Sequence, residues 1–372
     1  MPGGWYYAET GFGVRDEPAQ PRFWTEFQRL GGAGALGLPT SRPYDAPGTD
    51  GQPARVQAFQ QGWLAGAPGQ PAAQRGEGPA PPAPPEALVR EDRPEMAFVG
   101  RVDVLPRELR QGTTLLVRVW TQAAQSVTAI FDGREYPLAQ DGEAFAGLLG
   151  IHRAARLGQY PLRFTLVDGA GRRVVRNEAG DTVRVLDAEF PIEHLEVDPK
   201  TLGLLDPVKL RQEDALLDGI CSKWTPVRHW QGPFEPPVGA AAITSDFGVR
   251  RTINGGPPNW IHEGTDFDVQ VGDAVFAAAK GVVVHAAPLY TRGNAIFVDH
   301  GWGVMTGYFH LSRFEVQVGQ EVKKGQTIGL AGDTGFVTGP HLHVEVRVRN
   351  VMVEPLEWFN WAPFKRPDLA SL

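Results

Sequence analysis

The stretch "TGPHLHVEV", Thr338 to Val346, places two histidines one residue apart at the start of a hydrophobic segment. Successive side chains of a β-strand point to opposite faces, so residues two apart share a face. The segment therefore predicts a strand that holds His341 and His343 together on one side, where both can reach a single site.

A second segment upstream, "IHEGTDFDV", offers an imidazole and a carboxylate, His262 and Asp266, at an even separation. In an extended segment this spacing again puts both side chains on one face, and Gly264 between them allows backbone or metal to approach closely. These two residues and one histidine of the later strand would make a set of two imidazoles and a carboxylate. That set suits zinc in a catalytic site, which uses three protein ligands and leaves the fourth position to water.

Histidines are concentrated in this part of the chain, since six of the nine fall between residues 262 and 343. His310 follows Tyr308 near the end of another strand run, "GYFHLS". A lone histidine in a strand is more often an ordinary core or surface residue, and we interpret His285 and His300 in this way. The pair in "HEGTD" could equally form a turn hydrogen bond. The metal hypothesis therefore depends on all three segments occurring together.

Composition limits the classes of protein that fit. The chain has 372 residues with 45 Gly and 32 Pro, which indicates more than one domain and a turn-rich, mainly β architecture. A formal net charge of −7 without a cluster of Lys and Arg argues against nucleic-acid binding. The single cysteine, Cys221, excludes an internal disulfide and a CxxC metal site, so a bound metal must use His and carboxylate ligands.

The sequence predicts no transmembrane segment, because no apolar run is long enough to span a bilayer. The start, "MPGGWYYAET", lacks the basic and apolar regions of a secretory signal. If the protein is exported, its signal peptide is not present in this sequence.

Shifts in composition divide the chain into six predicted segments. The clearest is rich in Pro, Gly and Ala and is typical of an extended, partly polyproline linker. Before it, "FWTEFQRLGG" has Phe23, Phe27 and Leu30 at helical spacing and ends at Gly31-Gly32. The segments are a small module (1–66), the linker (67–95), an immunoglobulin-like β-sandwich (96–190), a helical connector (191–235), a second β domain (236–360) and a C-terminal tail (361–372).

The middle of the chain indicates strands and then a helix. Short β-branched and aromatic runs are separated by turns at Asp132-Gly133 and Asp168-Gly169, which is the pattern of a sandwich. No ionisable cluster occurs in them, so we expect a spacer or positioning role. Asp206-Pro207 then predicts the N-cap and first turn of a short helix.

The N-terminal module contains "FWTEFQRLGG", "LGLPTSRPY" and "QAFQQGWL", in that order. Over residues 10–65 these motifs resemble the LGFP-type repeats of some bacterial cell-wall-associated proteins. The resemblance makes the module a candidate for wall binding. The alternative is a small packed aromatic module that binds no ligand.

The second β domain carries a more specific resemblance. In order and spacing, residues 236–360 are similar to the lysostaphin/LytM family of zinc peptidoglycan endopeptidases. The motifs are "TSDFGVRR", "HEGTDFDVQVGDAVFAAAKGVVVHAA", "GNAIFVDHG", "YFHLSRFEVQVGQEVKKGQTIGLAGDTGFVTGPHLHVEV" and "VEPLEWF". The resemblance implies an antiparallel β-groove related to the biotinyl/lipoyl hybrid motif, and the repeated "VQVGDAV" and "VQVGQEVKKG" agree with it. It also implies hydrolysis of peptide cross-links or stem peptides of peptidoglycan, in the cell envelope or outside the cell.

The resemblance also implies the roles of five residues. One Zn²⁺ ion is held by His262, Asp266 and His343, while His341 and His310 are catalytic histidines that do not bind it. We expect His341 to be the base, because it shares a strand with a ligand. His310 would orient the water or steady the oxyanion, and the two roles could exchange.

One departure concerns the oxyanion. Some relatives place a tyrosine shortly before the first zinc histidine, whereas this chain has "RTINGGPPNW". Asn254, a backbone amide or His310 is left to fill the role, and Asn254 is alternatively a resting-state ligand. Asn254 and Tyr308 are accordingly the candidates for substrate contact.

Two other functions compete with the enzyme. A catalytically silent relative would act as a cell-wall scaffold or as an activator of other hydrolases, although the three ligands and both further histidines are all retained here. A carrier of the biotinyl/lipoyl type would need a modifiable lysine in a Met-Lys-Met-like hairpin, which the sequence lacks.

Overall fold

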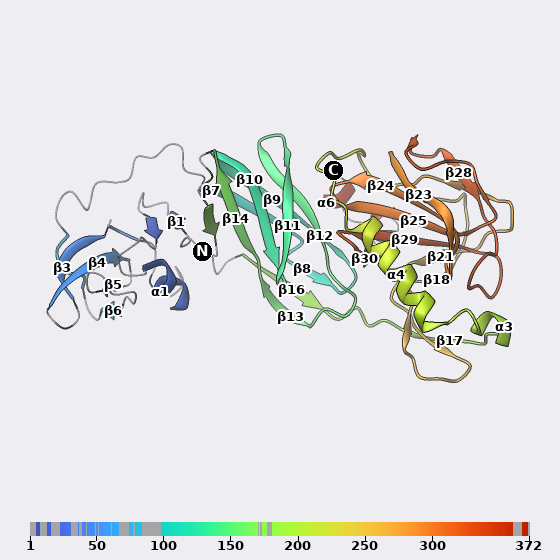
Figure 1. Cartoon of the computed structure of the whole chain (residues 1–372), viewed down its shortest axis with the longest axis horizontal. Helices are drawn as coiled ribbons and strands as arrows, with labels where there is room; N and C mark the ends of the chain where they lie inside the picture. The colour runs from blue at the N-terminus through green and yellow to red at the C-terminus, as the bar shows by residue number, and fades with distance from the viewer. Residues whose placement is uncertain are drawn as a thin grey trace. The chain divides into compact units, whose positions relative to one another are not determined.

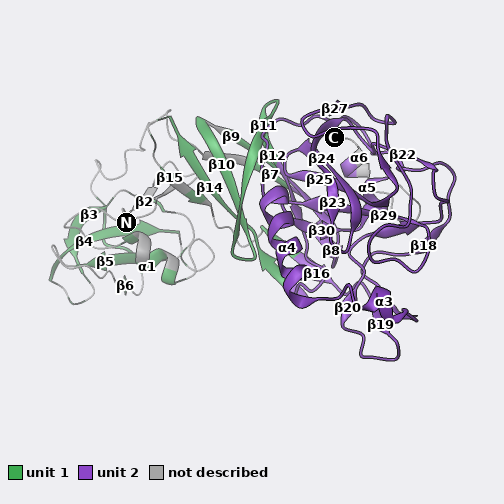
Figure 2. Cartoon of the chain, turned by 45° about the vertical axis from the view of Figure 1, so that its right-hand side comes forward, with its two compact units in different colours: residues 1–103, 118–146, 159–183 green, residues 104–117, 147–158, 184–372 purple. Residues whose placement is uncertain are grey.

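The computed structural model of the chain forms two compact units, coloured in Figure 2. The first comprises residues 1–103, 118–146 and 159–183, and the second residues 104–117, 147–158 and 184–372. The structure describes residues 5–7, 13–15, 23–30, 36, 39–41, 43–48, 50, 52–60, 62–66, 74–76, 79–83, 98–169, 171, 173–176, 181–359 and 367–370.

The N-terminal part of the first unit holds a helix and a small sheet (Figure 1). The predicted helix is confirmed as α1 (Phe23–Arg29), and its expected stop at Gly31-Gly32 lies outside the described residues. Phe23 and Phe27 are buried against Leu36, Phe59 and Leu64. The antiparallel sheet has the order β3 (Tyr44–Pro47), β4 (Pro53–Phe59), β5 (Gly62–Gly66) and β6 (Gln74–Gly76).

The predicted linker (67–95) differs from the structure where its residues are described. Gln74–Gly76 forms strand β6 beside β5, and the Tyr44 hydroxyl donates to the carbonyl of Pro81. Ala80 and Ala83 pack against the aromatic core of the small sheet. An extended proline-rich segment can cover apolar side chains without forming hydrogen bonds within itself, so part of this segment belongs to the module.

Most of residues 98–186 lie in two sheets. The larger has the order β2-β1-β15-β14-β10-β11-β12-β9-β7, and the chain passes from one unit to the other within β7, β9 and β12. Positive φ angles at Asp132 (47°) and Gly133 (73°) confirm the predicted tight turn. The immunoglobulin-like topology and the LGFP-like module stay predictions. The strands are β1 (Trp5–Tyr7), β2 (Gly13–Arg15), β7 (Phe98–Leu105), β9 (Thr114–Gln122), β10 (Ala124–Phe131), β11 (Arg134–Asp141), β12 (Ala144–Gly150), β14 (Arg163–Asp168) and β15 (Arg173–Arg176), and the second sheet has the order β13 (Gly158–Pro161), β16 (Thr182–Leu186) and β8 (Glu108–Arg110).

The connector contains β17 (Ile192–Leu195), α3 (Pro199–Leu202) and α4 (Pro207–Cys221). Asp206 is the N-cap of α4, as predicted, because its carboxylate accepts from the backbone of Val208 (2.8 Å) and Lys209 (3.4 Å). Leu217 and Cys221 of this helix pack into the large sheet of the second unit. None of the helices among the described residues is long and apolar enough to cross a membrane.

The remainder of the second unit is a mainly β domain, as predicted. Its large antiparallel sheet has the order β18-β21-β29-β25-β24-β23-β27, with β30 beside β29 (Figure 1). Two small sheets, β17-β19-β20 and β22-β28-β26, complete it. The elements are β18 (Ile243–Ser245), β19 (Arg250–Ile253), β20 (Trp260–Ile261), β21 (Thr265–Phe267), β22 (Ala274–Phe276), β23 (Gly281–Leu289), β24 (Gly293–Gly301), β25 (Val304–Leu311), β26 (Arg313–Phe314), β27 (Glu321–Val322), β28 (Thr327–Leu330), β29 (Leu342–Val348), β30 (Val351–Val353), α5 (Pro355–Trp358) and α6 (Pro367–Ala370).

The two repeated "VQVG" motifs adopt the same turn. In each, the residue after the glycine donates its backbone N–H to the first glutamine of the motif, from Asp273 to Gln270 and from Gln320 to Gln317, both at 3.1 Å. The glycine between them has a positive φ in both turns, 96° and 85°. This agreement supports the duplicated motif expected from the sequence.

Glu354 is a buried acid at the N-cap of α5. Its carboxyl accepts from the backbone of Leu356 (3.1 Å) and from the Thr265 hydroxyl (3.4 Å). Burial raises the pKa of Glu354 to about 8. The folded protein therefore keeps a proton that the unfolded chain loses above its ordinary pKa of 4.5.

The free energy of unfolding should consequently fall as the pH rises from 4.5 to about 8, the two pKa values of Glu354. The total decrease is roughly 5 kcal/mol at most. Glu354→Gln keeps the acceptor oxygen but cannot ionise. We expect the Tm of the parent, measured by differential scanning calorimetry, to fall with pH across this interval more steeply than that of Glu354→Gln. Glu321→Gln, at an exposed position, is the matched control and should follow the parent. Parallel Tm curves for all three proteins would contradict the expectation.

Candidate metal centre

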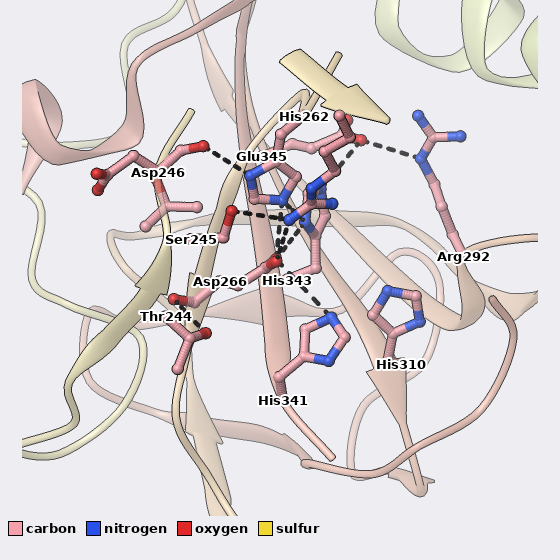
Figure 3. A network of polar contacts seen from close by, with 12 residues as sticks. Thr244, Ser245, Asp246, His262, Asp266, Arg292, His310, His341, His343 and Glu345 are labelled. Carbon is pink, nitrogen blue, oxygen red and sulfur yellow. Dashed lines mark hydrogen bonds and ion pairs between the residues drawn. The ribbon is translucent and has the colours of Figure 1, made fainter. Parts of the chain in front are cut away.

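Strand pairing brings together the residues that the sequence predicts as metal ligands. β21 and β29 are antiparallel neighbours in which Asp266 is the direct partner of His343. The hairpin of β19 and β20 leads into His262 just before β21. Figure 3 shows the three side chains directed at one another from these segments.

The three ligand atoms form a tight, buried cluster. His262 Nε2 lies 2.9 Å from Asp266 Oδ1 and 2.9 Å from His343 Nδ1, and His343 Nδ1 lies 2.7 Å from Asp266 Oδ1. The three residues form a buried group of potential metal ligands among those that the structure describes. The structure therefore places His262, Asp266 and His343 together as predicted.

The hydrogen-bond partners of the imidazoles indicate how this cluster can accept a cation. His262 Nδ1 is 2.7 Å from the carbonyl oxygen of Asp246, which can only accept, so Nδ1 carries the proton and Nε2 presents a lone pair. His343 Nδ1 faces both His262 Nε2 and Asp266 Oδ1, so in the tautomer with its proton on Nε2 the cluster consists of three acceptors. Three converging acceptors repel one another unless a proton or a metal ion lies among them.

The pKa shifts have the same origin. Burial alone would raise the pKa of Asp266, but the charges and hydrogen bonds of His262 and His343 hold it well below its usual range. Burial lowers the pKa of His262, and Asp266 only partly offsets this effect. For His343, burial is outweighed by Asp266 and Glu345, so its pKa is raised. The site thus attracts positive charge.

Zinc fits this donor set. Bonds of about 2.0–2.2 Å at tetrahedral angles would hold the ligand atoms about 3.3 Å apart, so the cluster must open by a few tenths of an ångström. The second nitrogen of each imidazole faces an oxygen, the Asp246 carbonyl for His262 and, 3.7 Å away, the Glu345 carboxylate for His343. Such outer contacts are typical of zinc-binding histidines.

A buried ion network supports His343 from behind. Arg292 donates to Glu345 (3.0 Å), to Glu213 of α4 (2.9 Å) and to Glu263 (3.1 Å). Glu345 also pairs with Arg347 at 2.7 Å. Our sequence interpretation missed this network, although its signal was present: His343, Glu345 and Arg347 recur at every second position of β29, all on the face that carries the ligand.

The two remaining histidines lie beside the cluster. The ring centroids of His310 and His341 are 4.8 Å apart, and His341 Nε2 is 3.8 Å from Asp266 Oδ1. His341 Nδ1 donates to the Gly339 carbonyl (2.9 Å) and His310 Nδ1 to that of Thr334 (2.8 Å), so both present an Nε2 lone pair. His310 also has a φ of +60°, an uncommon conformation for a non-glycine residue and one that clusters at functional sites.

The cluster opens onto a cavity of about 600 Å³. Its wall includes the five predicted residues and, from the connector, Leu195, Leu205 and Leu210. Arg153, from the loop after β12, also lines the cavity and pairs with Glu263 at 3.1 Å. A peptide entering this space would meet both apolar and charged walls.

The two candidates for substrate contact lie outside the cavity lining. The Asn254 amide accepts from the Val197 N–H (2.7 Å) and donates to the Val197 carbonyl (2.9 Å), which ties it to the connector. Tyr308 is fully buried, and its oxygen accepts from the Ala278 N–H (2.9 Å) and the Thr306 hydroxyl (2.8 Å). Burial raises the pKa of Tyr308 to about 12. Both side chains therefore hold the fold together.

The two histidines that we interpreted as ordinary core or surface residues, His285 and His300, have backbone partners of their own. His300 is buried, with Nδ1 donating to the Lys280 carbonyl (2.8 Å), and burial lowers its pKa to about 4. His285 contacts the carbonyl of Ala287 at 3.1 Å. Neither lines the cavity.

Gly264 allows the cluster to form, because a Cβ at this position would lie 2.7 Å from His343 Nε2 and would also overlap the Val344 carbonyl oxygen. Gly264→Ala must displace His343, so we expect zinc affinity to fall by roughly 10- to 100-fold. Competition with a chromophoric chelator measures this affinity. Gly239→Ala, where a Cβ meets no atom within 4 Å, is the control. Equal zinc affinities for both variants and the parent would show that the close approach does not matter.

Comparisons with known proteins cover the domain that contains this cluster. Residues 260–355 match the model of peptidase family M23. Over 96 residues the chain is 46% identical to the peptidoglycan DD-endopeptidase ShyA of Vibrio cholerae, and over 121 residues 38% identical to the DD-carboxypeptidase/endopeptidase Mpg of Neisseria meningitidis. These matches cover 26% and 32% of this chain, but only 22% and 27% of the relatives' own length.

A likeness in fold extends further along the chain. A crystal structure of a Pseudomonas aeruginosa protein assigned to peptidase M23 covers 67% of this chain and 94% of its own, with a TM-score of 0.50 and 24% identity. The motifs, the strand pairing and the family match agree on the same part of the chain. The similarity to peptidase family M23 therefore falls on residues 260–355, the part of the chain that holds the cluster.

Proposed function

We propose that the protein is a zinc-dependent endopeptidase that hydrolyses peptide cross-links or stem peptides of bacterial peptidoglycan. The observation that carries the proposal is the convergence of three acceptor atoms, from His262, Asp266 and His343, at the wall of a cavity that His310 and His341 also line. The similarity to ShyA, a peptidoglycan DD-endopeptidase, and to Mpg, a DD-carboxypeptidase/endopeptidase, supports the substrate class. The proposed place of action is the cell envelope or the extracellular space.

A zinc ion held by these three residues would polarise the scissile carbonyl and lower the pKa of water from about 15.7 to about 7. His341 is the proposed base. Its Nδ1–H is held by the Gly339 carbonyl, which leaves Nε2 as the basic atom beside the cluster. It takes a proton from the attacking water and returns it to the amine nitrogen when the C–N bond breaks.

His310 has the properties of a group that orients water. Burial lowers its pKa well below the ordinary value, so the ring is neutral at physiological pH. Its Nδ1–H is committed to Thr334, and its Nε2 can then only accept a hydrogen bond. A neutral acceptor can hold a water proton, but it cannot stabilise a negatively charged oxygen.

The rest of the chain would deliver this domain to its substrate. Wall binding by the N-terminal module is part of the proposal, since the module's motifs resemble those of wall-associated proteins. The sandwich would act as a spacer. The partner is thus a peptidoglycan peptide.

Substitutions separate the two classes of residue. His262→Ala and Asp266→Ala should lose zinc, measured by mass spectrometry of the dialysed protein, because two ligands do not retain the ion. His310→Ala should keep zinc and fold, yet lose roughly 10²- to 10⁴-fold in hydrolysis of a peptidoglycan suspension. His285→Ala, outside the cavity lining, should behave like the parent.

A His310→Ala variant that clears the suspension as fast as the parent would refute the catalytic assignment. If the zinc-loaded parent itself releases no peptides from walls with different cross-bridges, the enzyme proposal fails. The silent scaffold or activator would then be the better account.

A further inference from the structure

Arg251 is a charged residue of the cavity wall that the roles above do not use. It lies on β19, and its side chain is 20% exposed. Nε donates to Glu193 at 2.8 Å, while Nη2 donates to Asp266 Oδ2 at 3.0 Å and to the Ser245 hydroxyl at 2.8 Å. These three contacts fix the guanidinium beside Asp266, whose other carboxylate oxygen belongs to the predicted metal site.

The anchors leave part of the guanidinium available. Arginine has five N–H donors, and Nε and Nη2 supply three of them to these contacts. Within the part of the chain that the structure describes, the hydrogen bonds and ion pairs of Arg251 use only Nε and Nη2. The two N–H groups of Nη1 are thus left for a ligand, and Arg251 is part of the cavity wall.

The reaction requires such a donor. When water adds to a peptide carbonyl, the π electron pair moves onto the carbonyl oxygen, and preorganised donors aimed at that oxygen lower the barrier. The two other side chains considered for this role are occupied: His310 Nδ1–H donates to Thr334, and the Asn254 amide is bonded to Val197. Arg251 is permanently charged and already held in place.

We propose that Arg251 is a catalytic residue whose Nη1 donates to the carbonyl oxygen of the scissile peptide bond as that oxygen becomes negative. The inference rests on the proposed function. The water oxygen bonds to the carbonyl carbon, the C–N bond then breaks with its electron pair on nitrogen, and His341 carries the proton between them. Arg251 keeps all its protons throughout and compensates charge only.

The test compares Arg251→Gln with Arg250→Gln at saturating zinc, using a purified cross-linked muropeptide as substrate. Arg250 is the neighbouring exposed arginine on the same strand. We expect kcat of Arg251→Gln to fall by about 10²- to 10³-fold with little change in KM, the loss typical of one oxyanion donor. In Arg251→Ala, added guanidinium ion should restore part of kcat. Arg250→Gln should retain the parent's kcat.

Three results would overturn the inference. A raised KM with unchanged kcat would mean that Arg251 binds substrate without stabilising the transition state. Recovery of the parent rate in Arg251→Gln at higher zinc concentration, with a weaker zinc Kd, would make it a positioning residue for Asp266. A parent-like kcat at all zinc concentrations would remove any role. Inactivity of the parent on this substrate is a different outcome, because it refutes the proposed function itself.

Discussion

The register of β21 against β29 is the constraint on which the site depends. It sets Asp266 directly opposite His343, and the chain before β21 brings His262 to within 2.9 Å of both. A slip of one residue in either strand would turn a ligand to the other face of the sheet. Gly264 is part of the same constraint, because only a residue without Cβ lets the two segments approach this closely. The geometry of the cluster is therefore built into the sheet.

Two arginines hold the carboxylates around the cluster in place, one on each side of it. Behind it, Arg292 links Glu345, which faces His343, to Glu213 of α4, so the connector contributes to the surroundings of a predicted metal ligand. On the cavity side, Arg251 holds the second oxygen of Asp266. Buried ion pairs lose much of their Coulomb attraction to desolvation. Their value here lies in the defined positions that they impose on groups that must act together.

Much of the site could be predicted from the sequence, because its signals are local. The period of two in "HLHVEV" predicts two imidazoles on one face, and the "HEGTD" motif supplies the other two predicted ligands. The N-cap at Asp206 likewise identified α4. The ties of Arg251 could not be predicted in this way, since Glu193 lies 58 residues away and meets it through the parallel pairing of β17 with β19. The structural role of Asn254 could not be predicted either, because its amide is bonded to the backbone of Val197 in the connector and no local sequence pattern indicates this contact.

The central claim is that this cluster of acceptors serves metal-dependent hydrolysis of a peptide bond. Mass spectrometry of one purified cross-linked muropeptide dimer, incubated with metal-free protein before and after addition of one equivalent of zinc, tests it most directly. The account predicts an intact dimer without zinc and, with zinc, two fragments whose masses sum to that of the dimer plus one water. An intact dimer under both conditions, or equal cleavage in both, would contradict it.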